Sequence, residues 1–349
     1  MWKTTSFFIV IARKQCYNYQ KVFVLEGNME VQISTFDYKP EYIKDGFEFV
    51  ALNYPYNKKE AIKIVTGTRP IQEYIDYINK NNIDSAEIIM PNIEFLKYCP
   101  GLKHLKIWPS YDSTENFDFS PLYTHPEILT LHCGNQYGNR DQYLSKIDYS
   151  RINGIIKLSV SANKSTLNFN TINTLKLLRV GNFKSQKRDL YDLFRSKQLD
   201  TLELNGGNFE SLNGIENTEK LQCLYLYYNR SLKDISSLRK VKKTIKALRI
   251  ENCPKIEDFS VLAELENLEL LELTGKNVLP DLKFINSMKN LKTFVFDMNV
   301  EDGDLTPCLN LSYVYCDKNR KHYNLKDKDL PKGKYVRGNE DIEIWRRLE

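Results

Sequence analysis

The chain has 349 residues, 42% of them hydrophobic and 27% charged, a composition that is normal for a folded protein. No long segment lacks hydrophobic residues, so no large disordered region is expected. The 50 basic and 45 acidic residues leave a formal net charge of +5, too small an excess to indicate a nucleic-acid-binding protein. The 7 cysteines are odd in number and include no C-x-x-C pair. Reduced thiols in a cytoplasmic protein are therefore favoured over a disulfide framework or a structural zinc site.

The first apolar run, TTSFFIVIA, is too short to span a bilayer. Arg13 and Lys14 follow it, where a secretion signal would carry a small-residue cleavage site. A buried strand is therefore favoured over a signal peptide. Whether Met1 or Met29 starts the protein stays open, since MEVQIS opens a second plausible strand.

Residues 1–82 are predicted to form a β-rich cap that ends in a helix. FFIVIA, KVFVLE, MEVQIS and FEFVALN have the character of strands, and RPIQEYIDYINKNN places Ile71, Tyr74, Ile75 and Ile78 on one helical face. A repeat array needs such a cover for its first hydrophobic face. An active site in this region is an alternative, although residues 1–80 contain no histidine for acid–base chemistry.

A repeat organises the rest of the chain. LQCLYLYYN, from Leu221, has apolar residues at offsets zero, three and five and an asparagine at offset eight. Further copies of this frame start at Leu102, Pro126, Ile155, Leu175, Leu199, Ile245, Leu268, Leu291 and Leu311, with a degenerate copy at Ile83. Successive starts after Leu102 lie 20 to 29 residues apart, which is the period of a leucine-rich repeat.

Offset eight is expected to form a structural ladder. The chain must bend there, and an asparagine amide can satisfy backbone groups that the bend leaves buried. Cysteine is the usual substitute. The predicted ladder residues are Asn163, Asn229, Cys253, Asn299 and Asn319.

The segments LKDISSLRKV, IEDFSVLAEL, LPDLKFINSM and FDFSPLYTH follow the ladder, and Asp118, Asp234 and Asp258 are expected to cap short helices in them. Over about residues 96–319 the chain resembles internalin-like and phosphatase-regulator-like leucine-rich-repeat proteins. The resemblance implies an α/β solenoid with a curved parallel sheet on the concave side and short helices or 3₁₀ turns on the convex side. About 10 to 11 repeats would fill residues 83–322, and residues 323–349 would close the array, with Trp345 in the cap.

Residues suited to catalysis are sparse. His104 and His132 fall on adjacent predicted strands, but no carboxylate or cysteine joins them at a convincing metal-ligand spacing. No nucleophile-elbow, phosphate-loop or zinc-protease motif occurs. The basic runs RKVKK and NRKH lack interleaved aromatic residues. We expect no catalytic residue, no cofactor, no metal and no nucleic-acid partner.

Side chains at offsets two, four and six alternate with the core residues and so face the concave side. They give the candidate partner-binding residues, with Tyr225 and Tyr227 as exposed aromatic anchors among charges. Alternatively, Arg179–Glu203 and Arg249–Glu272 pair across strands while the tyrosines stack on their neighbours. The full candidate set is Trp108, His132, Arg179, Glu203, Tyr225, Tyr227, Arg249, Glu251, Glu272, Asp297, Tyr313 and Tyr315.

These patterns predict a non-catalytic, monomeric, cytoplasmic protein that binds a protein partner, without a membrane, through its concave face. By analogy with bacterial leucine-rich-repeat proteins, the preferred specific role is an immunity protein that neutralises a cognate toxin. A regulatory scaffold similar to a phosphatase regulator is a second hypothesis, and a secreted or surface adhesin is a third.

Overall fold

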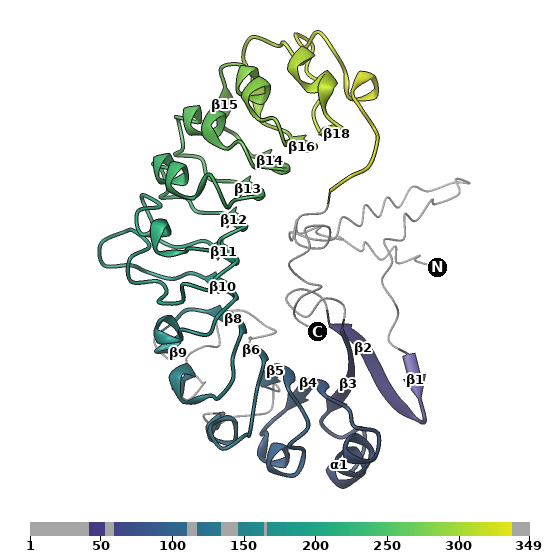
Figure 1. Ribbon diagram of the computed structural model, residues 1–349. Helices are drawn as coiled ribbons and strands as arrows, with labels where there is room; N and C mark the ends of the chain where they lie inside the picture. The colour runs from purple at the N-terminus through teal and green to yellow at the C-terminus, as the bar shows by residue number, and fades with distance from the viewer. Residues whose placement is uncertain (1–41, 53–58, 110–116, 134–145, 164–165, 337–349) are drawn as a thin grey trace, which may run out of the picture.

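The computed structural model describes residues 42–52, 59–109, 117–133, 146–163 and 166–336 (Figure 1). The strands expected in FFIVIA, KVFVLE and MEVQIS lie outside these residues. Met1, Met29 and Trp345 also lie outside them, so the structure does not bear on which methionine starts the protein or on the predicted role of Trp345.

One curved sheet of 14 strands runs through the described residues and lines the inner side of an arc (Figure 1). Short helices and loops cover its outer side. In spatial order the strands are β1 (Tyr42–Lys44), β2 (Phe47–Leu52), β3 (Lys59–Val65), β4 (Ser85–Met90), β5 (His104–Pro109), β6 (Thr130–Cys133), β8 (Lys157–Ser161), β10 (Leu177–Gly181), β11 (Thr201–Asn205), β12 (Cys223–Tyr227), β13 (Ala247–Glu251), β14 (Leu270–Thr274), β16 (Thr293–Phe296) and β18 (Tyr313–Cys316).

From β3 onward every neighbouring pair in this sheet is parallel, and equal offsets of successive repeats lie side by side. Arg179 pairs with Glu203, and Glu203 with Tyr225. The degenerate copy is in register too, because Ser85 pairs with His104. The chain is therefore the α/β leucine-rich-repeat solenoid that the sequence predicts.

The frame predicted from Pro126 is wrong by two residues. His132 lies beside Lys106 rather than beside Trp108, and Thr130 lies beside His104. The repeat thus starts at Ile128, which is fully buried. A shift of two residues preserves the alternation of inward and outward side chains, so the alternation alone could not distinguish the two frames.

Short 3₁₀ helices form the convex side, and aspartates cap several of them as predicted. The carboxylates of Asp118, Asp234 and Asp258 each accept a hydrogen bond from the backbone N–H two residues later, at 2.8 Å. Within the described residues, the 3₁₀ helices are Glu94–Tyr98, Ser120–Tyr123, Tyr149–Arg151, Phe169–Thr171, Ile215–Asn217, Ser236–Val241, Ser260–Glu264, Lys283–Ser287, Thr306–Asn310 and Asp327–Asp329. Two small parallel pairs join β7 (Ile147–Asp148) to β9 (Thr166–Leu167) and β15 (Val278–Leu279) to β17 (Asn299–Val300).

An antiparallel unit precedes the repeats. β1 pairs with β2 and β2 with β3 in antiparallel fashion, and β3 joins β4 in parallel. Helix α1 (Ile71–Lys80) follows β3 and buries Tyr74, Ile75 and Ile78, the face that the sequence predicts. These side chains share one continuous core with the repeats. Where the cap ends and the repeats begin, near residue 82, stays a prediction.

The C-terminal end of the array is closed by the chain that follows β18. Pro331 O accepts a hydrogen bond from Val314 N at 2.8 Å, and Lys332 forms an antiparallel bridge with Tyr313. The chain then turns from this edge onto the concave side. The end of the array is thereby hydrogen-bonded by its own backbone, which removes a free sheet edge there.

Candidate partner-binding face

Two predicted ladder residues make equivalent contacts in consecutive repeats. Asn229 is buried, and its Nδ2 donates to the carbonyls of Leu204 at 2.9 Å and Tyr227 at 3.1 Å. Cys253 directs its Sγ at the carbonyls of Leu226 at 3.8 Å and Glu251 at 3.5 Å. Each residue thus links the bend of its own repeat to the strand of the repeat before.

The other three predicted ladder residues have different surroundings. Asn163 accepts a hydrogen bond from the Thr166 hydroxyl. Asn299 is half-buried in β17, and its predecessor Met298 is the fully buried residue. Asn319 is exposed, and its Oδ1 accepts from Asp327 N at 2.7 Å. These three positions lie where the repeat becomes irregular or ends.

Tyr225 and Tyr227 do face the concave side, but the expected exposure is wrong. Their exposed fractions are 1% and 3%. They form an apolar cluster with Cys223, Ala247 and Leu270 of the same face, and Val336 belongs to that cluster as well. We call Cys223, Tyr225, Tyr227, Ala247 and Leu270 the apolar patch. The residue that joins it from elsewhere, Val336, belongs to the C-terminal segment that follows β18.

Charged residues flank the apolar patch as cross-strand pairs. Arg179 Nε lies 2.8 Å from Glu203 Oε1, and Arg249 Nε lies 3.1 Å from Glu272 Oε2. The Arg249 guanidinium also lies 4.9 Å from the ring centre of Tyr225. Burial raises the pKa of both glutamates, and the neighbouring arginines oppose that rise. The charges therefore pair across strands, as the alternative prediction for these residues states.

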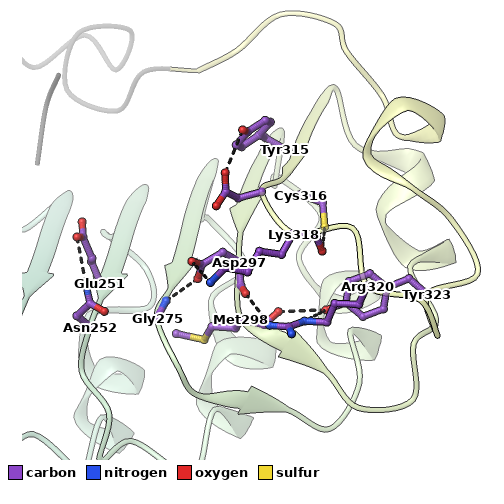
Figure 2. A network of polar contacts seen from close by, with 11 residues as sticks. Glu251, Asn252, Gly275, Asp297, Met298, Tyr315, Cys316, Lys318, Arg320 and Tyr323 are labelled. Carbon is purple, nitrogen blue, oxygen red and sulfur yellow. Dashed lines mark hydrogen bonds and ion pairs between the residues drawn. The ribbon is translucent and has the colours of Figure 1, made fainter. Parts of the chain in front are cut away.

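Asp297 is the centre of a polar network that connects the last repeats (Figure 2). Its Oδ1 accepts from Gly275 N at 2.6 Å, and its Oδ2 pairs with Lys318 Nζ at 2.9 Å. Arg320 Nη2 donates to the Asp297 carbonyl at 3.2 Å and Arg320 Nε donates to the Tyr323 hydroxyl, also at 3.2 Å. The Asp297 side chain is buried, and its negative charge is balanced by Lys318. These contacts hold neighbouring repeats together.

The remaining C-terminal candidates lie nearer the surface. Glu251 accepts a hydrogen bond from Asn252 Nδ2 at 3.2 Å. The Tyr315 side chain is 40% exposed, and its hydroxyl donates to Asp317 Oδ1 at 3.1 Å (Figure 2). Tyr313 is half-buried, and its ring meets that of Tyr335 edge-on, with ring centres 5.1 Å apart. Tyr315 is the candidate aromatic most accessible to a partner in this half.

At the N-terminal end, Trp108 and His132 come together. Their ring centres lie 5.1 Å apart, although they occupy different offsets. Trp108 Nε1 donates to Glu87 Oε1 at 3.1 Å, and the same oxygen pairs with Lys106 Nζ at 2.6 Å. His132 Nδ1 lies 2.8 Å from the Ser159 hydroxyl. This group forms a second aromatic cluster on the concave face.

Both concave histidines are held neutral. Burial lowers the pKa of His132 to about 3, with Arg179 and Lys106 adding to the effect. Burial and the charge of Lys59 lower the pKa of His104 to about 4. In the residues that the structure describes, no three histidine, cysteine or acidic side chains are grouped so that they could hold a metal ion.

Between these two clusters the structure places two charged residues that the sequence pattern did not indicate, the buried Lys157 and the half-buried Asp200. Burial lowers the pKa of Lys157 to about 8 and raises that of Asp200 to about 6. Lys157 lies at offset two and Asp200 at offset one, and the charge of each opposes the shift of the other. The available signal was the lysine at offset two, where other repeats carry Ala247 or Leu270; Asp200 gave none, because offset one is polar in most repeats, as at Gln222.

No family model matches the sequence, and no curated protein sequence matches it. Among solved structures, the chain is similar to an internalin from Listeria monocytogenes, at 17% sequence identity and a TM-score of 0.40, over 73% of this chain and 73% of that one. The strand register, rather than this likeness, defines the fold. Across the described residues, no helix has the length and apolar character that crossing a bilayer requires.

Proposed function

We propose that this chain is a non-catalytic protein-interaction module whose partner binds the concave face, chiefly over β12 to β18. One observation carries the proposal: this face already seats an extended piece of polypeptide. Val336 is buried in the cluster of the apolar patch, and its backbone N–H donates to the Thr293 hydroxyl at 3.0 Å. A surface that accepts one extended segment has the shape and chemistry to accept another.

The composition of the face agrees with this role. Aromatic residues and arginine, here Tyr225, Tyr227 and Arg249, are the types that dominate binding energy at protein interfaces. Ion pairs border the apolar patch on both sides. An apolar centre with a polar rim is the usual anatomy of such an interface.

Affinity purification with mass spectrometry tests the proposal, provided that accessible residues are changed on each side of the array. The concave variant is Glu251→Ala/Tyr315→Ala, which changes two outward-facing residues of β13 and β18. The matched convex variant is Tyr191→Ala/Leu309→Ala, which removes two exposed side chains outside the main sheet. We expect a direct partner to bind the wild-type and convex-variant chains and to be reduced at least about tenfold with the concave variant. Equal recovery from all three chains contradicts binding through this face.

The immunity-type role is the specific form of the proposal that we favour. The partner is then a toxin encoded beside this chain, and mixing the two purified proteins abolishes the toxin's activity. A gene neighbourhood without a toxin or effector gene argues against it. Recovery of a phosphatase catalytic subunit would instead select the regulatory-scaffold role.

A further inference from the structure

The segment that crosses onto the concave face has a firmly held base. Gly333 N donates to Ser312 O at 2.9 Å. Lys332 Nζ donates to Val314 O at 2.6 Å and pairs with Asp327 Oδ1 at the same distance. A Cβ on Gly333 would lie 2.7 Å from Ser312 O, so only glycine permits this close approach of backbone to backbone. Residues 331–333 are therefore anchored to the edge of the array.

The tip of the same segment is held by fewer bonds. Lys334 is exposed. Tyr335 is half-buried, makes the edge-on ring contact with Tyr313 and lies near Arg249, whose charge opposes the rise of the Tyr335 pKa caused by burial. Val336 is buried against the apolar patch and makes its one described backbone hydrogen bond to a side chain, that of Thr293. The tip thus depends on side-chain contacts, whereas the base is held by backbone.

We propose that residues 332–336, the C-terminal strap, are an intramolecular ligand that occupies the partner-binding face, and that a partner displaces the tip with an extended segment of its own carrying an aromatic residue followed by a β-branched residue. This inference rests on the proposed function for the identity of the face, and it adds the chemistry of the bound segment and its competition with the chain itself.

The arrangement of base and tip gives the strap its expected behaviour. The base keeps the tip close to its site, at an effective concentration on the order of 1 mM for a short tether. The tip can nevertheless leave without disturbing the core, because its contacts are with outward-facing side chains of the sheet. A separate segment with the same aromatic and β-branched pair must therefore compete with a ligand that is always present.

A peptide-binding experiment on the full chain tests the strap. The probe is a fluorescein-labelled peptide with the sequence LPKGKYV, and the control peptide is LPKGKSS. The protein is compared as wild type, as Tyr335→Ser/Val336→Ser and as Tyr98→Ser/Val278→Ser, which alters two exposed side chains away from the strap. Fluorescence anisotropy gives each Kd. Val336→Ser alone, which keeps Tyr335, serves if the double variant does not fold.

We expect LPKGKYV to bind the strap variant roughly tenfold more tightly than the other two chains, since a cis competitor at about ten times its own Kd suppresses binding by about this factor. LPKGKSS should not bind any of them. Equal affinity for all three chains, or no binding of LPKGKYV to either strap variant, overturns the proposal.

The fate of a captured partner separates this proposal from the proposed function. With the strap variant as bait, recovery of a concave-face partner should rise. If the peptide binds but no such partner is recovered, the proposed function is contradicted and the strap proposal is not. A concave-face partner whose recovery is the same with and without the strap removes the strap proposal alone.

Discussion

At the scale of single residues, the bend after each central strand requires a left-handed backbone. Asn182, Gly206, Tyr228, Asn252 and Gly275 occupy equivalent places in successive repeats, and all have positive φ. Glycine and asparagine tolerate this region, but a bulky aromatic residue does so at a cost of roughly 1–2 kcal/mol. Tyr228, with φ of 55°, is thus the strained member of the series.

Tyr228 therefore offers a test in which the backbone can be separated from the side chain. Tyr228→Gly and Tyr228→Ala both remove the ring that packs near the apolar patch, but only glycine relieves the left-handed strain. We expect the glycine chain to be more stable by about 1 kcal/mol in urea denaturation. At Ser161, which has no positive φ, the alanine variant should be more stable than the glycine variant. Equal stability of the two Tyr228 variants contradicts a strained bend.

At the scale of elements, the sequence period predicts the strands because each one is short, parallel and tied to a fixed position in its repeat. The frame failed only at β6, where leucines at both 129 and 131 fit the inward position. Ile128 is the residue that decides the frame, since it fills the buried first position that Pro126 cannot. The antiparallel strands of the cap follow no such period, so their pairing could not be predicted.

The aspartate caps of the convex helices are predicted to stabilise the array. Hydrogen bonds from the Ser260 backbone N–H and side chain hold the pKa of Asp258 below its usual value. The cap therefore contributes at neutral pH, and its contribution is lost as the pH falls below the usual aspartate pKa of 3.8 and through the lowered value. Asp258→Ala should cost roughly 1 kcal/mol at pH 7 and progressively less below pH 4, measured by urea denaturation. The control is Asp192→Ala, which changes an exposed aspartate. If Asp192→Ala loses as much stability as Asp258→Ala, or if the loss caused by Asp258→Ala does not change with pH, the cap does not stabilise the array.

At the scale of the whole molecule, the sequence could predict which side chains face the concave side but not which of them are covered. Alternation along the strands placed Tyr225 and Tyr227 outward. Their burial depends in part on Val336, which lies more than 100 residues away in a segment outside the repeat. No period links these positions, so the repeat pattern does not distinguish an outward-facing residue that is exposed from one that is covered. The internal compensation of Asp297 escaped prediction for a different reason: Gly275 and Lys318 lie at the bends of the repeats before and after it, and the repeat pattern does not predict contacts made at the bends.

The central claim is that the concave face of the C-terminal repeats is a polypeptide-binding surface that the chain covers with its own strap. Hydroxyl-radical footprinting of the full chain measures this cover side chain by side chain. We predict that Tyr225 and Tyr227 are protected in the wild-type protein while Tyr98 and Tyr315 react, and that both protected tyrosines become reactive in Tyr335→Ser/Val336→Ser. Tyrosines 225 and 227 that react in the wild-type chain as fast as Tyr98, or that stay protected in a folded strap variant, would contradict the account.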